Sequence, residues 1–72
     1  MDNMDLHLKG LIDFDMCIIN ELKPNKFALE YEEGCLVLYD TELDICIGHN
    51  SYEDINLMRN RIVGLRYGLQ CS

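Results

Sequence analysis

Apolar and polar residues alternate between Lys26 and Gly48, and no other feature of the chain constrains its fold as strongly. Every second residue from Phe27 to Tyr31 is apolar and large, which is the period of a half-buried strand. Glu33-Gly34 is expected to form a two-residue turn, because glycine readily adopts the positive φ that such turns require. A second polar turn at Thr41-Glu42 leads into another apolar run. The block therefore predicts an antiparallel three-stranded meander.

The two turns also predict how the strands pair. A loop at Glu33-Gly34 places Leu29 opposite Leu38, and a loop at Thr41-Glu42 places Leu38 opposite Ile45. Opposed residues share a face of the sheet, so both hairpins collect apolar side chains on one face. The predicted apolar face consists of Phe27, Leu29, Tyr31, Leu36, Leu38, Ile45 and Ile47.

The C-terminal segment carries the clearest helix signal. Ser51 is a favourable N-cap, and Asp54 follows at the spacing of a capping box. Apolar residues then recur every three or four positions, which predicts one buried stripe facing the sheet. The stripe consists of Ile55, Met58, Ile62, Leu65 and Leu69.

Residues 5–22 fit two interpretations. Most of their large apolar residues occupy even positions, which favours one or two strands with a bend near Lys9-Gly10. The competing helix would place Asp15 inside its apolar stripe, so the strand is preferred. The predicted fold is accordingly α+β, with an antiparallel meander of four or five strands packed against one C-terminal amphipathic helix. Residues 1–72 are expected to form a single small acidic domain.

Charge points to the class of partner. The chain has 13 acidic and six basic residues, for a net charge of −7. All the acids lie in residues 1–54, whereas residues 55–72 contain three arginines and no acid. Such a surface repels nucleic acid and attracts a basic protein surface. No apolar run is long enough to cross a membrane, and the acidic N-terminus is unlike a secretory signal, so a cytoplasmic location is expected.

The sequence offers no recognisable catalytic or cofactor chemistry. The four cysteines are expected to be reduced, since no export signal precedes them. Cys46 and His49 have the spacing of metal ligands, but in a strand their side chains would point to opposite faces. No metal site is therefore predicted. The two histidines lie in no nucleophile motif, and the dispersed glycines form no phosphate-binding loop. We therefore expect neither enzymatic activity nor a cofactor.

The sheet face opposite the apolar one is the predicted binding site. Carboxylates there surround an apolar centre and a tyrosine, which is how many interfaces are built. The predicted partner-binding residues are Glu30, Glu32, Val37, Tyr39 and Asp44. The expected function is a protein-binding modulator or inhibitor, resembling in composition the small inhibitors that phages and mobile elements direct at host enzymes or defence proteins. Competing interpretations are that the N-terminal strands cover this face or that it is simply half exposed to solvent.

Two alternative functions remain open. A row of carboxylates can imitate a phosphate backbone, which would make the protein a nucleic-acid mimic. The candidates are Asp13, Asp15, Glu30, Glu32, Glu33, Asp40, Glu42 and Asp44.

The second alternative is a homodimer, formed through the same sheet face or through the side of the helix that carries Gly64 and Gly68. Leu57, Gly64 and Gly68 lie on the side of the helix away from the apolar stripe, and paired glycines allow close approach of a second backbone. Alternatively, the helix frays after Leu65 and Gly68 is its cap. Arg59 and Arg66 flank the stripe and are expected to reach toward the acidic sheet.

Overall fold

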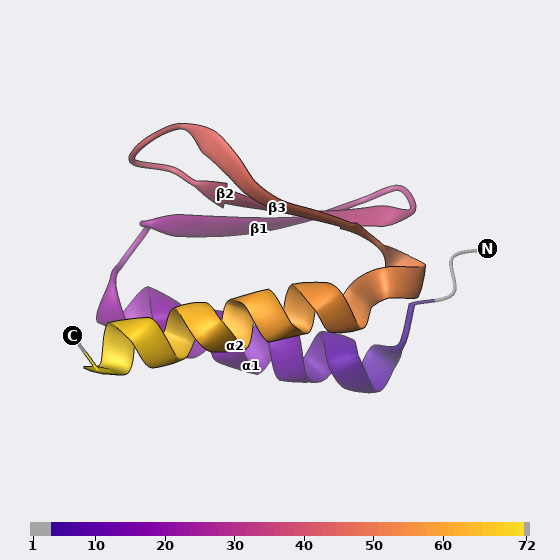
Figure 1. Cartoon of the computed structure of the whole chain (residues 1–72), viewed down its shortest axis with the longest axis horizontal. Coiled ribbons are helices and arrows are strands. Elements are labelled where there is room, and N and C mark those ends of the chain that lie inside the picture. Colours follow the sequence, from indigo (N-terminus) through magenta and orange to yellow (C-terminus); the bar gives the residue numbers. More distant parts are fainter. Residues whose placement is uncertain (1–3, 72) are drawn as a thin grey trace.

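Two helices pack against one face of a three-stranded antiparallel sheet in the computed structural model, which describes residues 4–71 (Figure 1). The elements follow the order α1 (Leu6–Leu22), β1 (Phe27–Glu32), β2 (Cys35–Asp40), β3 (Ile45–Ser51), a short 3-10 turn (Tyr52–Asp54) and α2 (Ile55–Cys71). The strands lie in the order β1-β2-β3. The predicted α+β class and C-terminal helix are thus confirmed.

The meander sets the direction of the helices. An odd number of strands carries the chain from one end of the sheet to the other, which is the end at which α1 began. Both helices therefore begin at the end that carries the β1–β2 turn and run the same way beneath the sheet (Figure 1). With both helices on one side, no helix between residues 4 and 71 covers the other face of the sheet.

The N-terminal segment is a helix, so the preference for strands was wrong. The described residues contain three strands rather than four or five, and two helices rather than one. Asp5 caps α1, because its Oδ1 accepts hydrogen bonds from the backbone N–H groups of His7 (3.0 Å) and Leu8 (3.1 Å). Ile12 and Ile19 are buried at helical spacing in the core.

Asp15 lies inside the apolar stripe of this helix, and the structure shows how its burial is tolerated. Asp15 is 4% exposed, and its Oδ1 lies 2.5 Å from Nη1 of Arg66 on α2. A buried carboxylate is tolerable when an opposite charge is hydrogen-bonded to it. Arg66 therefore pairs with α1 and does not reach the acidic sheet as expected. Its position 51 residues away explains why local sequence pattern could not reveal it.

The first hairpin matches its predicted register. Leu29 pairs with Leu38, Tyr31 with Leu36, and the loop is Glu33-Gly34. Gly34 has a φ of 81°, in the left-handed region that glycine adopts readily, as the predicted two-residue turn requires.

The second hairpin departs from its predicted register. Leu38 pairs with Gly48 instead of Ile45, because the loop spans four residues (41–44) and the register shifts between Leu38 and Tyr39. The backbone N–H groups of Glu42 and Leu43 both donate to Oδ1 of Asp40 at 3.0 Å, which stabilises the longer loop.

This change also moves the apolar residues of β3. Ile45, expected in the core, lies opposite Asp40 at the end of the sheet and is 48% exposed. Ile47 falls at the shift and is only partly buried against the core.

The core fills the space between the sheet and the two helices. The residues of the predicted α2 stripe do face it, with Ile55, Met58 and Ile62 buried and Leu65 and Leu69 partly buried. The Tyr52 hydroxyl donates to the carbonyl of Glu32, which ties the start of α2 to the end of β1. The buried members of the core are Ile12, Ile19, Leu36, Leu38, Tyr52, Ile55, Met58 and Ile62.

Candidate binding face

The uncovered face of the sheet, here called the outer face, brings together most of the predicted binding residues. Strand pairing arranges it in three rows across β1, β2 and β3. The rows are Ala28, Tyr39 and Cys46; Glu30, Val37 and His49; and Glu32, Cys35 and Ser51. Neither lysine nor arginine occurs among these residues.

Val37 lies at the centre of the outer face but is not open to solvent. It is 5% exposed, although both helices lie on the opposite side of the sheet. Glu30 and His49 flank it in the same row, and Cys35 and Tyr39 flank it along the strand. These neighbours cover the apolar centre, so Val37 supports the surface around it more than it offers contact area.

Tyr39 provides the accessible aromatic group of the face. Its ring is half-buried beside Ala28 and Cys46. Desolvation raises the pKa of the Tyr39 hydroxyl, and the negative charges of Glu32 and Glu30 raise it further. The hydroxyl therefore stays protonated at neutral pH. No other described residue forms a hydrogen bond with it, which leaves it available as a donor to a partner.

A shallow open depression with a volume of about 310 Å³ lies beside Tyr39. Glu30 and Asp44, two further predicted residues, line it together with Tyr39. Asp44 comes from the β2–β3 loop, where it adopts a φ of 56°. The remaining wall is formed by Ala28, Asp40 and Thr41. Glu32 lies at the opposite end of the outer face, in the row next to the β1–β2 turn.

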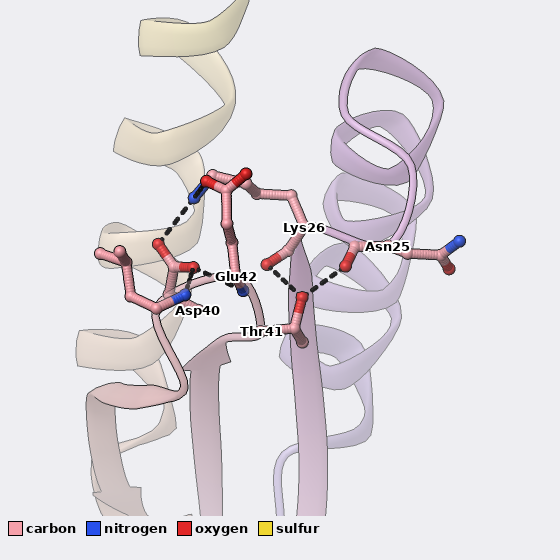
Figure 2. Close-up of polar contacts among 6 residues, drawn as sticks. Asn25, Lys26, Asp40, Thr41 and Glu42 are labelled. Atoms are coloured by element: carbon pink, nitrogen blue, oxygen red, sulfur yellow. Dashed lines mark hydrogen bonds and ion pairs between the residues drawn. The ribbon is translucent and has the colours of Figure 1, made fainter.

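A set of hydrogen bonds and ion pairs holds the wall of this depression in place. We call it the loop clasp, and it comprises Asn25, Lys26, Asp40, Thr41 and Glu42 (Figure 2). Lys26 Nζ lies 2.8 Å from Oδ2 of Asp40 and 3.1 Å from Oε1 of Glu42. The Thr41 hydroxyl points at the carbonyls of Asn25 and Lys26, its two hydrogen-bond acceptors.

The loop clasp is charged at neutral pH. The hydrogen bond from Lys26 lowers the pKa of Asp40, and the backbone N–H of Leu43 lowers it further. Hydrogen bonds to Asp40 and Glu42 raise the pKa of Lys26. Sequence reasoning missed this cluster. The signal present was the Asp40-Thr41 pair, since Asp and Thr often bond to the backbone of a turn.

The predicted self-association residues lie together on the exposed side of α2. Leu57 is 50% exposed, and a Cβ added at Gly64 or Gly68 would meet nothing within 4 Å. The helix continues to Cys71, so the alternative that it frays after Leu65 with Gly68 as its cap is wrong.

The carboxylates proposed to imitate nucleic acid do not form one open row. Asp15 and Asp40 are buried in ion pairs. Asp13 is held by Lys9 Nζ at 2.7 Å and by the Tyr31 hydroxyl at 2.6 Å. The remaining exposed acids are divided between the outer face and the turns.

Residues 4–71 contain no cluster of three or more His, Cys, Asp or Glu side chains placed to hold a metal ion. The four cysteines are free thiols. Within the same part of the chain, neither helix is sufficiently long and apolar to cross a membrane.

Comparisons with known protein families, with curated proteins and with solved structures found no match to this chain.

Proposed function

We propose that this protein is a small acidic binding module that docks its outer face onto a basic surface of a larger protein and modulates or inhibits it. One observation carries the proposal. Both helices leave this face open, and on it carboxylates surround a half-buried tyrosine with no lysine or arginine among them.

The spatial separation of charge supports a basic partner. Glu30, Glu32 and Asp44 lie on or beside the outer face, whereas all three arginines lie on α2 in the helical layer. The arginines that follow residue 54 in the sequence thus lie away from the outer face. A face of one sign steers an oppositely charged partner and orients it during encounter.

Tyr39 and the depression beside it supply the means of specific recognition. A ring that is already half-buried loses little side-chain entropy when a partner packs on it, and tyrosine is enriched among the residues that dominate binding energy. The carboxylates of Glu30 and Asp44 suit a lysine or arginine of the partner. Arginine in particular can bond a carboxylate through two parallel N–H groups.

The loop clasp contributes by ordering the site before binding. Asp44 lies in a loop in which Thr41 and Glu42 are bonded to Asn25 and Lys26, just before β1. A preorganised loop avoids part of the ordering cost that association otherwise carries.

The test is affinity capture from the source cell, followed by calorimetry with the purified partner. The variants are Tyr39→Ala and Glu30→Gln, and Glu21→Gln on the exposed side of α1 is the control with the same charge change. Tyr39→Ala should weaken binding by about 30-fold or more, as expected for a dominant interface residue. Glu30→Gln should weaken it less, and Glu21→Gln should leave it unchanged.

Equal binding by all three variants would contradict the proposal. A partner that salt releases completely, and whose affinity does not depend on Tyr39, would indicate nucleic-acid mimicry instead. The expected origin in a phage or mobile element stays a prediction that the identity of the captured partner can test.

A further inference from the structure

The sheet has two free edges within the described residues, and they differ in regularity. All six residues of β1 pair with β2 without interruption. The pairing of β3 is broken by the register shift between Leu38 and Tyr39. Irregularities of this kind are one way in which proteins protect sheet edges from pairing with another chain. β1 carries neither a bulge nor a proline, so it is the edge with which a strand of another chain can pair.

The hydrogen-bond pattern identifies which groups of β1 are open. Thr41 N–H donates to the carbonyl of Lys26 at 2.9 Å, which makes Lys26 a residue bonded toward β2. Bonded and non-bonded pairs alternate along an antiparallel ladder. The N–H and C=O groups of Phe27, Leu29 and Tyr31 therefore point away from β2, along the free edge.

The side chains of the same three residues line a groove between β1 and α1. The groove has a volume of about 310 Å³, and Met16 and Cys17 of α1 form part of its other wall. Its remaining lining residues are Asp13 and Asn20. A strand added at this edge would find both a row of backbone partners and a partly apolar space for its side chains.

We propose that this edge pairs with β1 of a second copy of the chain, giving a homodimer with a continuous six-stranded antiparallel sheet. In a two-fold arrangement centred on Leu29, the outward-pointing residues of one copy meet those of the other. Leu29 lies opposite its own counterpart, and Phe27 lies opposite Tyr31. Every outward N–H then meets an outward C=O, as a closed isologous contact requires.

Charge selects the same register. Centring the pair on Leu29 places Lys26 of each copy opposite Glu32 of the other, and Glu30 opposite Ala28. Centring it on Glu30 would place the two Glu30 side chains opposite each other, which destabilises a sheet. The Leu29-centred register also pairs the whole of residues 26–32. The strand is thus complementary to itself in backbone, apolar side chains and charge.

The dimer has a consequence for the outer face. A two-fold axis perpendicular to the sheet keeps the helices of both copies on one side, so the two outer faces join into one surface. The dimer is formed without a partner protein, so its test does not depend on the proposed function.

Two measurements on the intact chain test the proposal. The first is molar mass by sedimentation equilibrium from micromolar to millimolar concentration. It is done at physiological ionic strength, where repulsion between copies of net charge −7 is screened beyond about 8 Å. We expect the mass to rise from 8.4 kDa toward twice that value. The second is amide hydrogen exchange by NMR at both ends of this range. The amides of Phe27, Leu29 and Tyr31 should become protected at high concentration.

Two charge variants supply a matched comparison. Glu32→Lys places like charges opposite each other at both ends of the paired strands and should raise the dimer dissociation constant about three- to tenfold. Glu33→Lys makes the same change of charge at the exposed neighbouring turn position and should have a much smaller effect. Leu29→Pro, which removes an outward N–H of the edge strand together with the leucine side chain, should abolish the dimer. Its circular dichroism spectrum reports whether the monomer is still folded.

A protein that stays monomeric over the whole range would overturn the proposal. So would a dimer in which the three amides exchange at unchanged rates, because its interface would then lie elsewhere, for example on Leu57, Gly64 and Gly68. If Leu29→Pro does not fold, the exchange pattern of the unmodified chain and the pair of charge variants still decide the question.

Discussion

The two faces of the sheet are buried by different means, and two neighbouring residues of β2 show the difference. Leu38 points into the core and is 0% exposed, while Val37 points to the outer face and is 5% exposed. Leu38 is covered by helices that are distant from it in sequence. Within residues 4–71, no helix lies over Val37, and its neighbours on the sheet surround it. The inner face therefore holds the protein together, while the helices leave the outer face uncovered.

The largest expected effect comes from the charged group on the helical side. Asp15→Ala leaves the guanidinium of Arg66 without its buried partner and should lower the free energy of unfolding by about 3–5 kcal/mol. Glu30→Ala removes an exposed carboxylate from the outer face and should change it by no more than about 0.5 kcal/mol. Urea denaturation measures both values.

A double variant separates the ion pair from the packing around it. Asp15→Leu combined with Arg66→Leu should cost less than Asp15→Leu alone, because no unpaired charge remains. A double variant at least as destabilised as the single one would show that the unpaired guanidinium of Arg66 adds little to the loss caused by Asp15→Leu.

The direct comparison of the two faces uses a matched pair of truncations. Leu38→Ala should cost about 2–5 kcal/mol through lost burial and the cavity it leaves. Val37→Ala should cost only about 1.6 kcal/mol, from the loss of two methylene equivalents at about 0.8 kcal/mol each. Equal losses in urea denaturation would contradict this expectation and would mean that the outer face is as tightly packed as the core.

Acid should weaken the loop clasp at the edge of the outer face and so lower the free energy of unfolding. The pKa of Asp40 is lowered, chiefly by Lys26, so the folded state favours the ionised carboxylate. The stability this provides is complete above the unfolded pKa of about 3.9 and is lost as the pH falls through the lower folded value.

The control for this pH effect is Lys26→Gln, which removes the main cause of the shift. Urea midpoints measured between neutral and strongly acidic pH should fall less steeply in this variant than in the unmodified protein. Parallel pH profiles would show that the loop clasp does not couple protonation to folding.

The smallest effects are expected on the exposed side of α2. Gly64→Ala should raise the free energy of unfolding by about 0.8–1.0 kcal/mol, because alanine favours the helix and the added methyl meets open space. Gly34→Ala is the contrasting control, and it should destabilise the chain because its φ is 81°. If the stripe of Leu57, Gly64 and Gly68 mediates self-association, Gly64→Ala would also weaken the dimer, which sedimentation would detect.

Individual residues show which parts of the fold and of the candidate site could be predicted from the sequence. The first hairpin was predictable, since Gly34 marks the turn and the alternation around it sets the register. Four predicted binding residues share the outer face as a direct consequence. Asp44 lies beside Glu30 and Tyr39 because it belongs to the longer loop that Asp40 stabilises, and the alternation of apolar residues did not predict that loop. The loop clasp and the burial of Val37 depend on residues that meet only in the folded sheet.

By itself, the sequence determined the α+β class, the first hairpin, the apolar stripe of α2 and the acidic, lysine-free character of the outer face. These features follow from local periodicity and from turn residues with restricted φ, which act within a few positions. Tertiary structure alone decided that residues 6–22 form a helix, because Asp15 is tolerated there only through Arg66 on α2. The second register was decided by a local side-chain contact, because hydrogen bonds to the carboxylate of Asp40 compete with the two-residue turn that alternation favoured. In the first case the deciding partner is distant in sequence, and in the second it is a side-chain geometry that apolar periodicity does not encode.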